Sequence, residues 1–239
     1  MRAVLLTHNE TSTGVAHPIE ALSRVVQEET DALLLVDAIS SLGAMPLPLD
    51  DLGIDVVITG SQKAWGVPPG MALLGLSSRA VDALESARMP RYYFDLRKCR
   101  EARERGTMPF TPALPIVFAL DVALDFMLAE TASGVFARHH RAAETARRGV
   151  KALGLELFAD ERHASDTVTA FRPPEGVDEA KLRERLRTQH DTVLAPGQGR
   201  LQGTILRIGH LGWVEEKEIS AAVGALGAAL AELPFSSSA

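Results

Sequence analysis

Lys63 lies in a short connection between two apolar segments, where a lysine could take part in covalent chemistry. The β-branched run in Asp55–Thr59 predicts a buried strand, and Met71–Leu76 predicts a second one. The connection between them is rich in glycine and proline and carries one basic side chain. Burying a charged ammonium is costly unless it is paired or neutral. An amine condensed with a carbonyl cofactor avoids this cost; the alternative is an exposed lysine in a polar loop.

Two other side chains have types and positions that could support chemistry. Asp37 follows the apolar segment Ala32–Val36, and open α/β sheets bind their ligands at the carboxyl ends of such strands. One strand and its connection separate Asp37 from Lys63, so the two could lie at neighbouring strand ends. The alternative is an aspartate that caps the next turn. Arg207, in the predicted strand Thr204–Ile208, could hold a carboxylate through two parallel hydrogen bonds; the alternative is an arginine on the exposed face of that strand.

The elements that would position these residues alternate between strand and helix, which predicts an α/β fold. The predicted strands are Ala3–Thr7, Ala32–Val36, Asp55–Thr59, Met71–Leu76, Val168–Phe171 and Thr204–Ile208. The predicted helices are Pro18–Glu29, Ser78–Ala87, Ile116–Ala129, Val135–Leu153, Asp178–His190 and Val214–Leu233. We expect a three-layer αβα domain with a mainly parallel sheet over residues 1–131, and a smaller α+β domain over residues 132–239.

Composition and charge exclude several classes of partner. The 239 residues are 46% hydrophobic and 23% charged, as in ordinary globular proteins. The net charge of −6, without a basic block, argues against nucleic acid, and no apolar run is long enough for a membrane span. A single cysteine, Cys99, fits a reducing, cytoplasmic compartment, and no metal-ligand spacing is present. The charged and aromatic segment Arg88–Arg105 is expected to be a solvated face or a subunit contact, and the alternative is a basic patch that faces a ligand.

Five motifs in order along the chain resemble the class V aminotransferases, a group of fold-type I enzymes that depend on pyridoxal 5′-phosphate (PLP). These motifs are Thr7–Gly14, Leu34–Ala38, Ser61–Ala64, Phe110–Pro112 and Leu206–Gly209. The resemblance covers nearly the whole chain and is greatest to the alanine–glyoxylate and serine–glyoxylate aminotransferases. It implies an enzyme that moves an amino group from a small amino acid, of alanine or serine type, to a small 2-oxo acid such as glyoxylate. It also implies a homodimer.

The resemblance implies a role for each matching residue. Lys63 would form the Schiff base with PLP and move the substrate proton, and Asp37 would pair with the pyridine nitrogen. Arg207 would bind the substrate carboxylate. The other implied cofactor contacts are Thr11 near the ring oxygen, Ile39 on a ring face, Ser61 and Gln62 at the phosphate and ring-oxygen side, and Thr111 at the phosphate of the neighbouring subunit.

The sequence also departs from the family pattern. The family's N-terminal arm, its phosphate-binding Gly/Ser loop and its ring-stacking aromatic residue have no counterpart here, so we expect weakened PLP affinity. One alternative is therefore a truncated, catalytically inactive fragment that serves as a binding or assembly module. Another is a PLP lyase or desulfurase of the same fold. A desulfurase would need a mobile cysteine on a late loop, whereas Cys99 lies well before Arg207.

Overall fold

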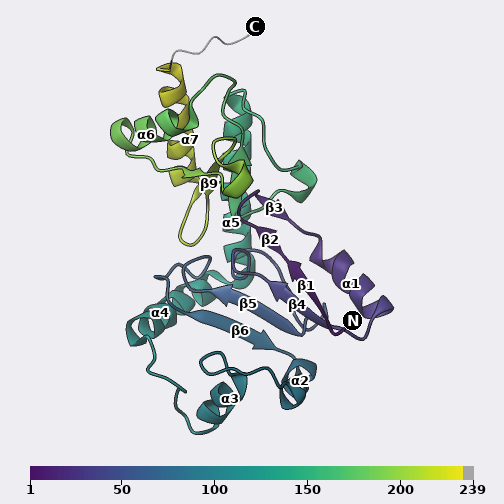
Figure 1. Cartoon of the computed structure of the whole chain (residues 1–239). Coiled ribbons are helices and arrows are strands. Elements are labelled where there is room, and N and C mark those ends of the chain that lie inside the picture. The colour runs from purple at the N-terminus through teal and green to yellow at the C-terminus, as the bar shows by residue number, and fades with distance from the viewer. Residues whose placement is uncertain (234–239) are drawn as a thin grey trace.

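The computed structural model describes residues 1–233, in which strands and helices alternate along the first part of the chain (Figure 1). The strands are β1 (Ala3–Thr7), β2 (Asn9–Glu10), β3 (Val15–Ala16), β4 (Leu33–Asp37), β5 (Val56–Gly60), β6 (Ala72–Leu76), β7 (Val168–Phe171), β8 (Ala195–Pro196) and β9 (Leu206–Gly209). The helices are α1 (Ile19–Glu29), α2 (Ser78–Ser86), α3 (Leu96–Glu104), α4 (Leu114–Glu130), α5 (Ala132–Ala152), α6 (Glu179–Gln189) and α7 (Glu216–Ala231). Within this range, every helix is too short or too polar to span a lipid bilayer.

The strands that carry the candidate residues belong to a four-stranded sheet in the order β1-β4-β5-β6. The first three strands run parallel, and β6 is antiparallel to β5. The predicted α/β class with a mainly parallel sheet is therefore confirmed. Leu34, Val36 and Val57 are buried on the face that α1 covers. Side chains alternate between faces along a strand, and on the opposite face Leu74 and Leu76 stay exposed, so residues 1–233 cover that face only partly.

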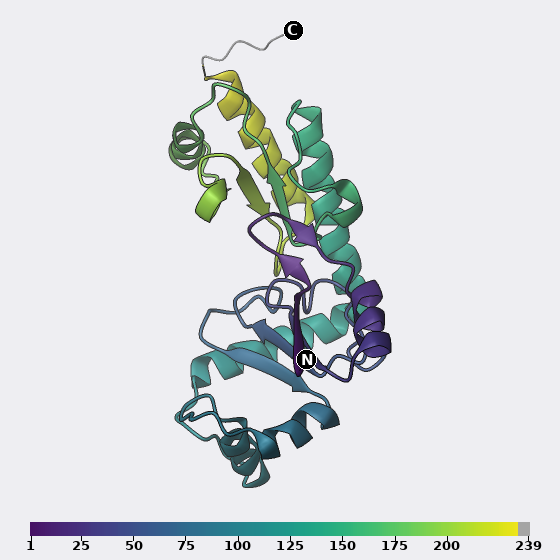
Figure 2. The same cartoon turned by 45° about the vertical axis from the view of Figure 1, so that its right-hand side comes forward.

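A second sheet, antiparallel and three-stranded, lies in the later part of the chain in the order β7-β9-β8. Helices α5, α6 and α7 pack around it on a core that includes Phe171, Leu186, Leu206 and Leu226. Figure 2 shows α5 and α7 side by side along this sheet. The core residues of this unit all follow Thr131, and those around the large sheet all precede it. The boundary between residues 131 and 132 itself stays a prediction.

Most predicted elements are present, with ends that differ by a few residues. The β2–β3 hairpin, strand β8, helix α3 and the 3-10 helices Glu161–His163 and Gly199–Leu201 were not predicted. Helix α3 lies within Arg88–Arg105, where the sequence predicted only a solvated face or a subunit contact. Asp95 caps it by accepting a hydrogen bond from Arg97 N at 3.1 Å, and Ala102 is its buried residue. A short helix with so little buried surface has no apolar stripe that the sequence could reveal.

His210 is a buried histidine that makes the small unit sensitive to acid. Its Nε2 lies 2.9 Å from Thr169 Oγ1, and its Nδ1 lies 2.9 Å from Asp166 O. Burial lowers the pKa of His210 to about 4, from an ordinary value of 6.5. Between these two pH values the unfolded chain binds more protons than the folded one. The free energy of unfolding therefore falls as the pH falls through this window, by up to about 1.4 kcal/mol per pH unit for this histidine.

This slope can be measured by urea denaturation between about pH 4.5 and pH 7, the window in which the His210 pKa difference acts. We expect His210→Gln to make the slope shallower, because glutamine binds no proton in this range. The exposed His163 provides the matched control, and His163→Gln is expected to leave the slope unchanged. An equal slope in the parent chain and His210→Gln would contradict the assignment.

Candidate active site

Asp37 is the last residue of β4, at the carboxyl edge of the parallel strands. The strand register places Thr7 of β1 and Ile58 of β5 on either side of it. The residues that follow these strands therefore meet at one edge, where open α/β sheets bind ligands. Asp37 Oδ1 accepts a hydrogen bond from Ile39 N at 3.0 Å, so the turn-capping contact considered as an alternative is present. The side chain is nevertheless exposed, and in residues 1–233 its second carboxylate oxygen has no hydrogen-bond partner.

Lys63 lies at the same edge, on the connection between β5 and β6. This connection is closed at its base, because Ser61 N donates to Met71 O at 3.0 Å. The Ser61 hydroxyl also donates to Pro68 O at 2.8 Å and accepts from Met71 N at 3.2 Å. Lys63 is half-buried, and among the described residues its amine has neither a hydrogen-bond nor an ion-pair partner. The loop thus holds a lysine amine that no other described residue engages.

The β2–β3 hairpin brings Arg207 of the small sheet to this edge. Arg207 donates from Nη1 to Thr11 O at 2.8 Å and from Nε to Pro196 O at 3.0 Å. It is only 6% exposed, so the alternative of an exposed strand arginine is wrong. Burial lowers the pKa of the Arg207 guanidinium, and the nearby Glu10 carboxylate opposes this effect; arginine stays charged at neutral pH. In the part of the chain that the structure describes, Nη2 has no partner.

Gly14 fixes the hairpin against β7. Its φ of +72° is left-handed, and an added Cβ would lie 3.1 Å from Val168 O and 3.2 Å from Ala170 N. Gly154 has nearly the same φ, +73°, but nothing lies within 4 Å of its Cβ position. We expect Gly154→Ala to lower the free energy of unfolding by about 1 kcal/mol, and Gly14→Ala by roughly 2–4 kcal/mol because it adds a collision to the same strain. Urea denaturation measures both; equal losses would mean that β7 does not hold the hairpin.

The remaining predicted residues are not all at the edge. Ile39 is half-buried in the turn after β4, and Gln62 is exposed and precedes Lys63 in the loop. The Ser61 hydroxyl is buried and engaged within its own loop, so its cofactor contact stays a prediction. Thr111 is exposed in the connection between α3 and α4 (Figure 1). Its role at the phosphate of a second subunit also stays a prediction.

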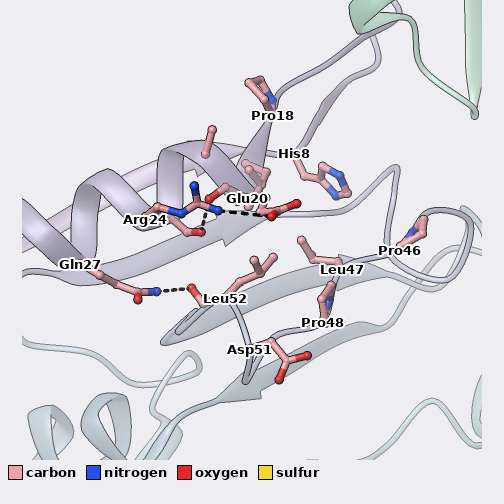
Figure 3. A pocket seen from close by; sticks show the side chains of 13 residues that line it. His8, Pro18, Glu20, Arg24, Gln27, Pro46, Leu47, Pro48, Asp51 and Leu52 are labelled. Atoms are coloured by element: carbon pink, nitrogen blue, oxygen red, sulfur yellow. Dashed lines mark hydrogen bonds and ion pairs between the residues drawn. The ribbon is translucent and has the colours of Figure 1, made fainter.

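A groove between α1 and residues 46–52 contains none of the residues predicted for the site (Figure 3). Its walls are joined by a hydrogen bond from Gln27 Nε2 to Leu52 O at 2.6 Å. His8 lines it, and its Nδ1 is buried without a partner among residues 1–233. Burial, together with the nearby His17, lowers the pKa of His8 to about 4, so this ring is neutral at pH 7. The groove nevertheless adjoins the carboxyl edge of the sheet, because His8 follows β1 and its backbone N donates to Asp37 O at 2.8 Å.

Two sets of contacts that order the edge had no signal in the sequence. Asn9 Nδ2 donates to Ser40 Oγ at 2.9 Å and to Thr167 Oγ1 at 3.0 Å, which ties the hairpin to both sheets. Trp213 lies against Gly66 in the loop that carries Lys63. Each contact joins residues that are far apart along the chain, and neither hydrophobic periodicity nor motif spacing reports on such pairs.

Comparison with known proteins relates this chain to aminotransferases. A family model described as "Aminotransferase class-V" matches residues 1–199. A protein of Synechococcus sp. named "Soluble hydrogenase, small subunit" is 45% identical over 98% of this chain and 61% of its own length. The L-aspartate–glyoxylate aminotransferase of Paracoccus denitrificans is 42% identical over 89% of this chain and 54% of its own. The crystal structure of a pyridoxamine–pyruvate aminotransferase from Mesorhizobium loti superposes with a TM-score of 0.92 at 37% identity, over 97% of this chain and 60% of that one. The chain thus spans about three fifths of the length of the relatives it matches.

Proposed function

This chain belongs to the class V aminotransferase family, and from that premise we propose that it acts as a PLP-dependent aminotransferase on small amino acids and small 2-oxo acids. The observation that carries the proposal is the arrangement at one edge of the large sheet. Asp37 ends β4 and Lys63 follows the adjacent parallel strand β5, and among residues 1–233 the Lys63 amine and one Asp37 carboxylate oxygen have no partner. Arg207 reaches the same edge through its hydrogen bond to Thr11.

The groups at this edge fit PLP. The cofactor's aldehyde requires an amine, which Lys63 supplies, and its ring nitrogen requires a carboxylate, which Asp37 supplies. When bound, PLP provides an electron sink for the negative charge that develops at the substrate α-carbon. The further cofactor contacts that we propose are the side chains of Thr11, Ile39, Ser61 and Gln62, and Thr111 from a second subunit.

Each of the three principal residues has a separate task in this proposal. Lys63 would hold the cofactor covalently, and its amine, when neutral, would move a proton at the substrate α-carbon. Asp37 would hold a proton on the ring nitrogen. Arg207 binds the substrate carboxylate through Nη2, which is not used within residues 1–233, and so fixes the α-carbon relative to the Lys63 amine.

Glyoxylate and pyruvate are the acceptors in the names of the aminotransferase relatives, and they support a small 2-oxo acid as the acceptor of this chain. Alanine, serine and aspartate are the donors to screen first. A homodimer is supported by the exposed apolar face of α4, which includes Phe118, Phe126 and Leu128. A cytoplasmic location rests on the single cysteine.

The hydrogenase name of one relative suggests a second candidate. Iron–sulfur clusters are held by several cysteine thiolates, whereas these 239 residues contain Cys99 alone. Cys99 is exposed on α3, which Figure 1 shows at the bottom of the molecule, away from β9. This placement also disfavours a desulfurase, because such an enzyme needs a cysteine that reaches the substrate. The donor set at the carboxyl edge of the sheet therefore favours amino-group transfer.

The proposal is tested by titrating the purified chain with PLP and following absorbance in the visible range. We expect a band that borohydride abolishes, with the reduced cofactor's mass added at Lys63 on peptide mapping. Alanine, serine and aspartate are then each supplied with glyoxylate, and the keto acid products are measured. A folded chain that gives neither the band nor any keto acid would contradict the proposal and favour a catalytically inactive binding module.

A further inference from the structure

Trp213 lies directly over the loop that carries Lys63. Gly66 has a left-handed φ of +69°, and a Cβ added there would lie 2.8 Å from Trp213 Cδ1 and Nε1. Gly66 N donates a hydrogen bond to Lys63 O at 3.0 Å. The indole of Trp213 therefore covers Gly66, whose backbone is hydrogen-bonded to the Lys63 carbonyl.

Gly212, the residue before Trp213, also packs against the Lys63 loop. This residue is also left-handed, with a φ of +76°, and its Cβ position lies 3.4 Å from Gly66 Cα and 3.7 Å from Lys63 O. It follows β9 closely, and the connection is anchored at His210, whose N donates to Thr167 O at 3.0 Å. A short, hydrogen-bonded segment thus joins the Arg207 strand to the Lys63 loop.

Arg138 of α5 holds Trp213 in place. Its guanidinium carbon lies 5.2 Å from the indole centroid, and its Nη1 donates to Gly212 O at 2.7 Å and to Val214 O at 3.3 Å. It also makes two parallel hydrogen bonds to Glu130, of 2.8 Å and 3.0 Å. Such paired bonds fix the guanidinium plane as well as its position.

This cluster bridges α4, α5, the segment after β9 and the Lys63 loop. Glu130 is the last residue of α4 and Arg138 lies in α5, with Thr131 between the two helices at a φ of +71°. The ring of Phe126, also in α4, meets Trp213 edge to face at 5.7 Å. Trp213 therefore touches elements on both sides of the helix junction.

We propose that Trp213, oriented by Arg138, is a positioning residue that couples carboxylate binding at Arg207 to the position of the Lys63 amine. A carboxylate bound at Arg207 moves or stiffens the end of β9. Through its contact with Gly66, the Trp213 indole passes this change in position or mobility to the Lys63 backbone. This inference rests on the roles proposed above for Arg207 and Lys63. It adds Trp213, whose described contacts are with Gly66, Phe126 and Arg138.

The test uses the cofactor-free chain and propionate, a carboxylate with neither an amino nor a keto group. Propionate binding is measured by calorimetry, and Lys63 reactivity by the rate of reductive methylation with formaldehyde and cyanoborohydride, followed at Lys63 by mass spectrometry. In the parent chain we expect saturating propionate to change this rate at least about fivefold, the lower end of ordinary coupling between sites. In Trp213→Ala we expect propionate still to bind but the rate to change less than twofold, about the level at which coupling is negligible.

Matched variants separate coupling from general damage. Trp213→Phe keeps an aromatic ring over Gly66 and is expected to restore most of the response, whereas Arg138→Met is expected to weaken it. Arg141 is another arginine of α5, with an exposed ion pair to Glu216, and Arg141→Met is expected to respond like the parent. Circular dichroism and the thermal midpoint confirm that each variant is folded. If Trp213→Ala is unfolded, the propionate-induced change in Lys63 reactivity is compared among Trp213→Phe, Arg138→Met and Arg141→Met instead. Equal changes in Arg138→Met and Arg141→Met would then overturn the coupling.

The outcomes distinguish the two proposals. If propionate does not bind, or binds equally well to Arg207→Met, the role of Arg207 fails and the coupling fails with it. If propionate binds through Arg207 but changes Lys63 reactivity equally in the parent, Trp213→Ala and Arg138→Met, the coupling alone is overturned. If it binds without changing Lys63 reactivity in the parent, the coupling is also overturned, and the proposed function stands.

Discussion

Replacing Lys63 with alanine is expected to abolish the borohydride-sensitive absorbance band and to lower kcat by roughly 10²–10⁴-fold or more, the range for loss of a positioned acid–base group. The reason is that one amine both holds the cofactor and moves the substrate proton. The loop itself should survive, because its closing hydrogen bonds are made by Ser61 and not by the lysine side chain. Absorbance, peptide mass mapping and the thermal midpoint are measured on the same preparation.

The matched control for this prediction is Lys181→Ala. Lys181 is an exposed lysine of α6 in the small unit, and its Nζ lies 3.9 Å from Asp178 Oδ2 in a surface ion pair. We expect it to leave the absorbance band and kcat unchanged. If Lys63→Ala kept the band, or if the borohydride-fixed mass appeared on another lysine, the assignment of Lys63 would be wrong.

Replacing Arg207 with methionine is expected to raise the KM for the amino donor strongly. Removing one partner of a buried charge pair costs about 2–5 kcal/mol, which is roughly 30-fold to several-thousand-fold in a dissociation constant. The same change leaves Thr11 O and Pro196 O without their donors, so we also expect the free energy of unfolding to fall by about 1–3 kcal/mol.

Two further variants separate binding from stability. Arg207→Lys keeps the charge without the planar pair of donors, and its KM is expected to lie between those of the parent and Arg207→Met. Arg200, exposed in the turn before β9, is the control, and Arg200→Met should change neither quantity. A less stable Arg207→Met with an unchanged KM would mean that this arginine only connects the hairpin to the small sheet.

The sequence predicted those parts of the fold in which local pattern and burial agree. The apolar runs that became β4 and β5 were predicted almost to the residue, because central strands of a parallel sheet are apolar on both faces. Strand β1, at the edge of the sheet, was predicted with the same bounds from its own apolar run. The hairpin β2–β3 and strand β8 were missed because strands of two residues are too short for any alternation to appear. Their positions are set by tertiary contacts such as Gly14 against Val168.

The candidate site was predictable in its residue types and less so in its contacts. The pattern could not decide whether Arg207 was exposed, because a single arginine in a short strand is compatible with either face. Its burial follows from Thr11 O and Pro196 O, which are remote in sequence. Ser61 shows the converse: it lies next to the predicted reactive residues, yet its hydroxyl closes the loop. Asp55 is also instructive, because this second aspartate beside a strand is buried and receives hydrogen bonds from Leu34 N and the Ser77 hydroxyl.

The sequence separation of the contacts at the edge also constrains the order of folding. Thr11 and Arg207 are 196 residues apart, and Asn9 and Thr167 are 158 residues apart. Closing loops of this length costs more entropy than forming either sheet's local pairings, and contacts between distant residues form slowly. The reactive edge should therefore be completed late in folding, after both sheets exist. For the same reason, a partial opening of either sheet would release Arg207 from the hairpin while most of the molecule was still folded.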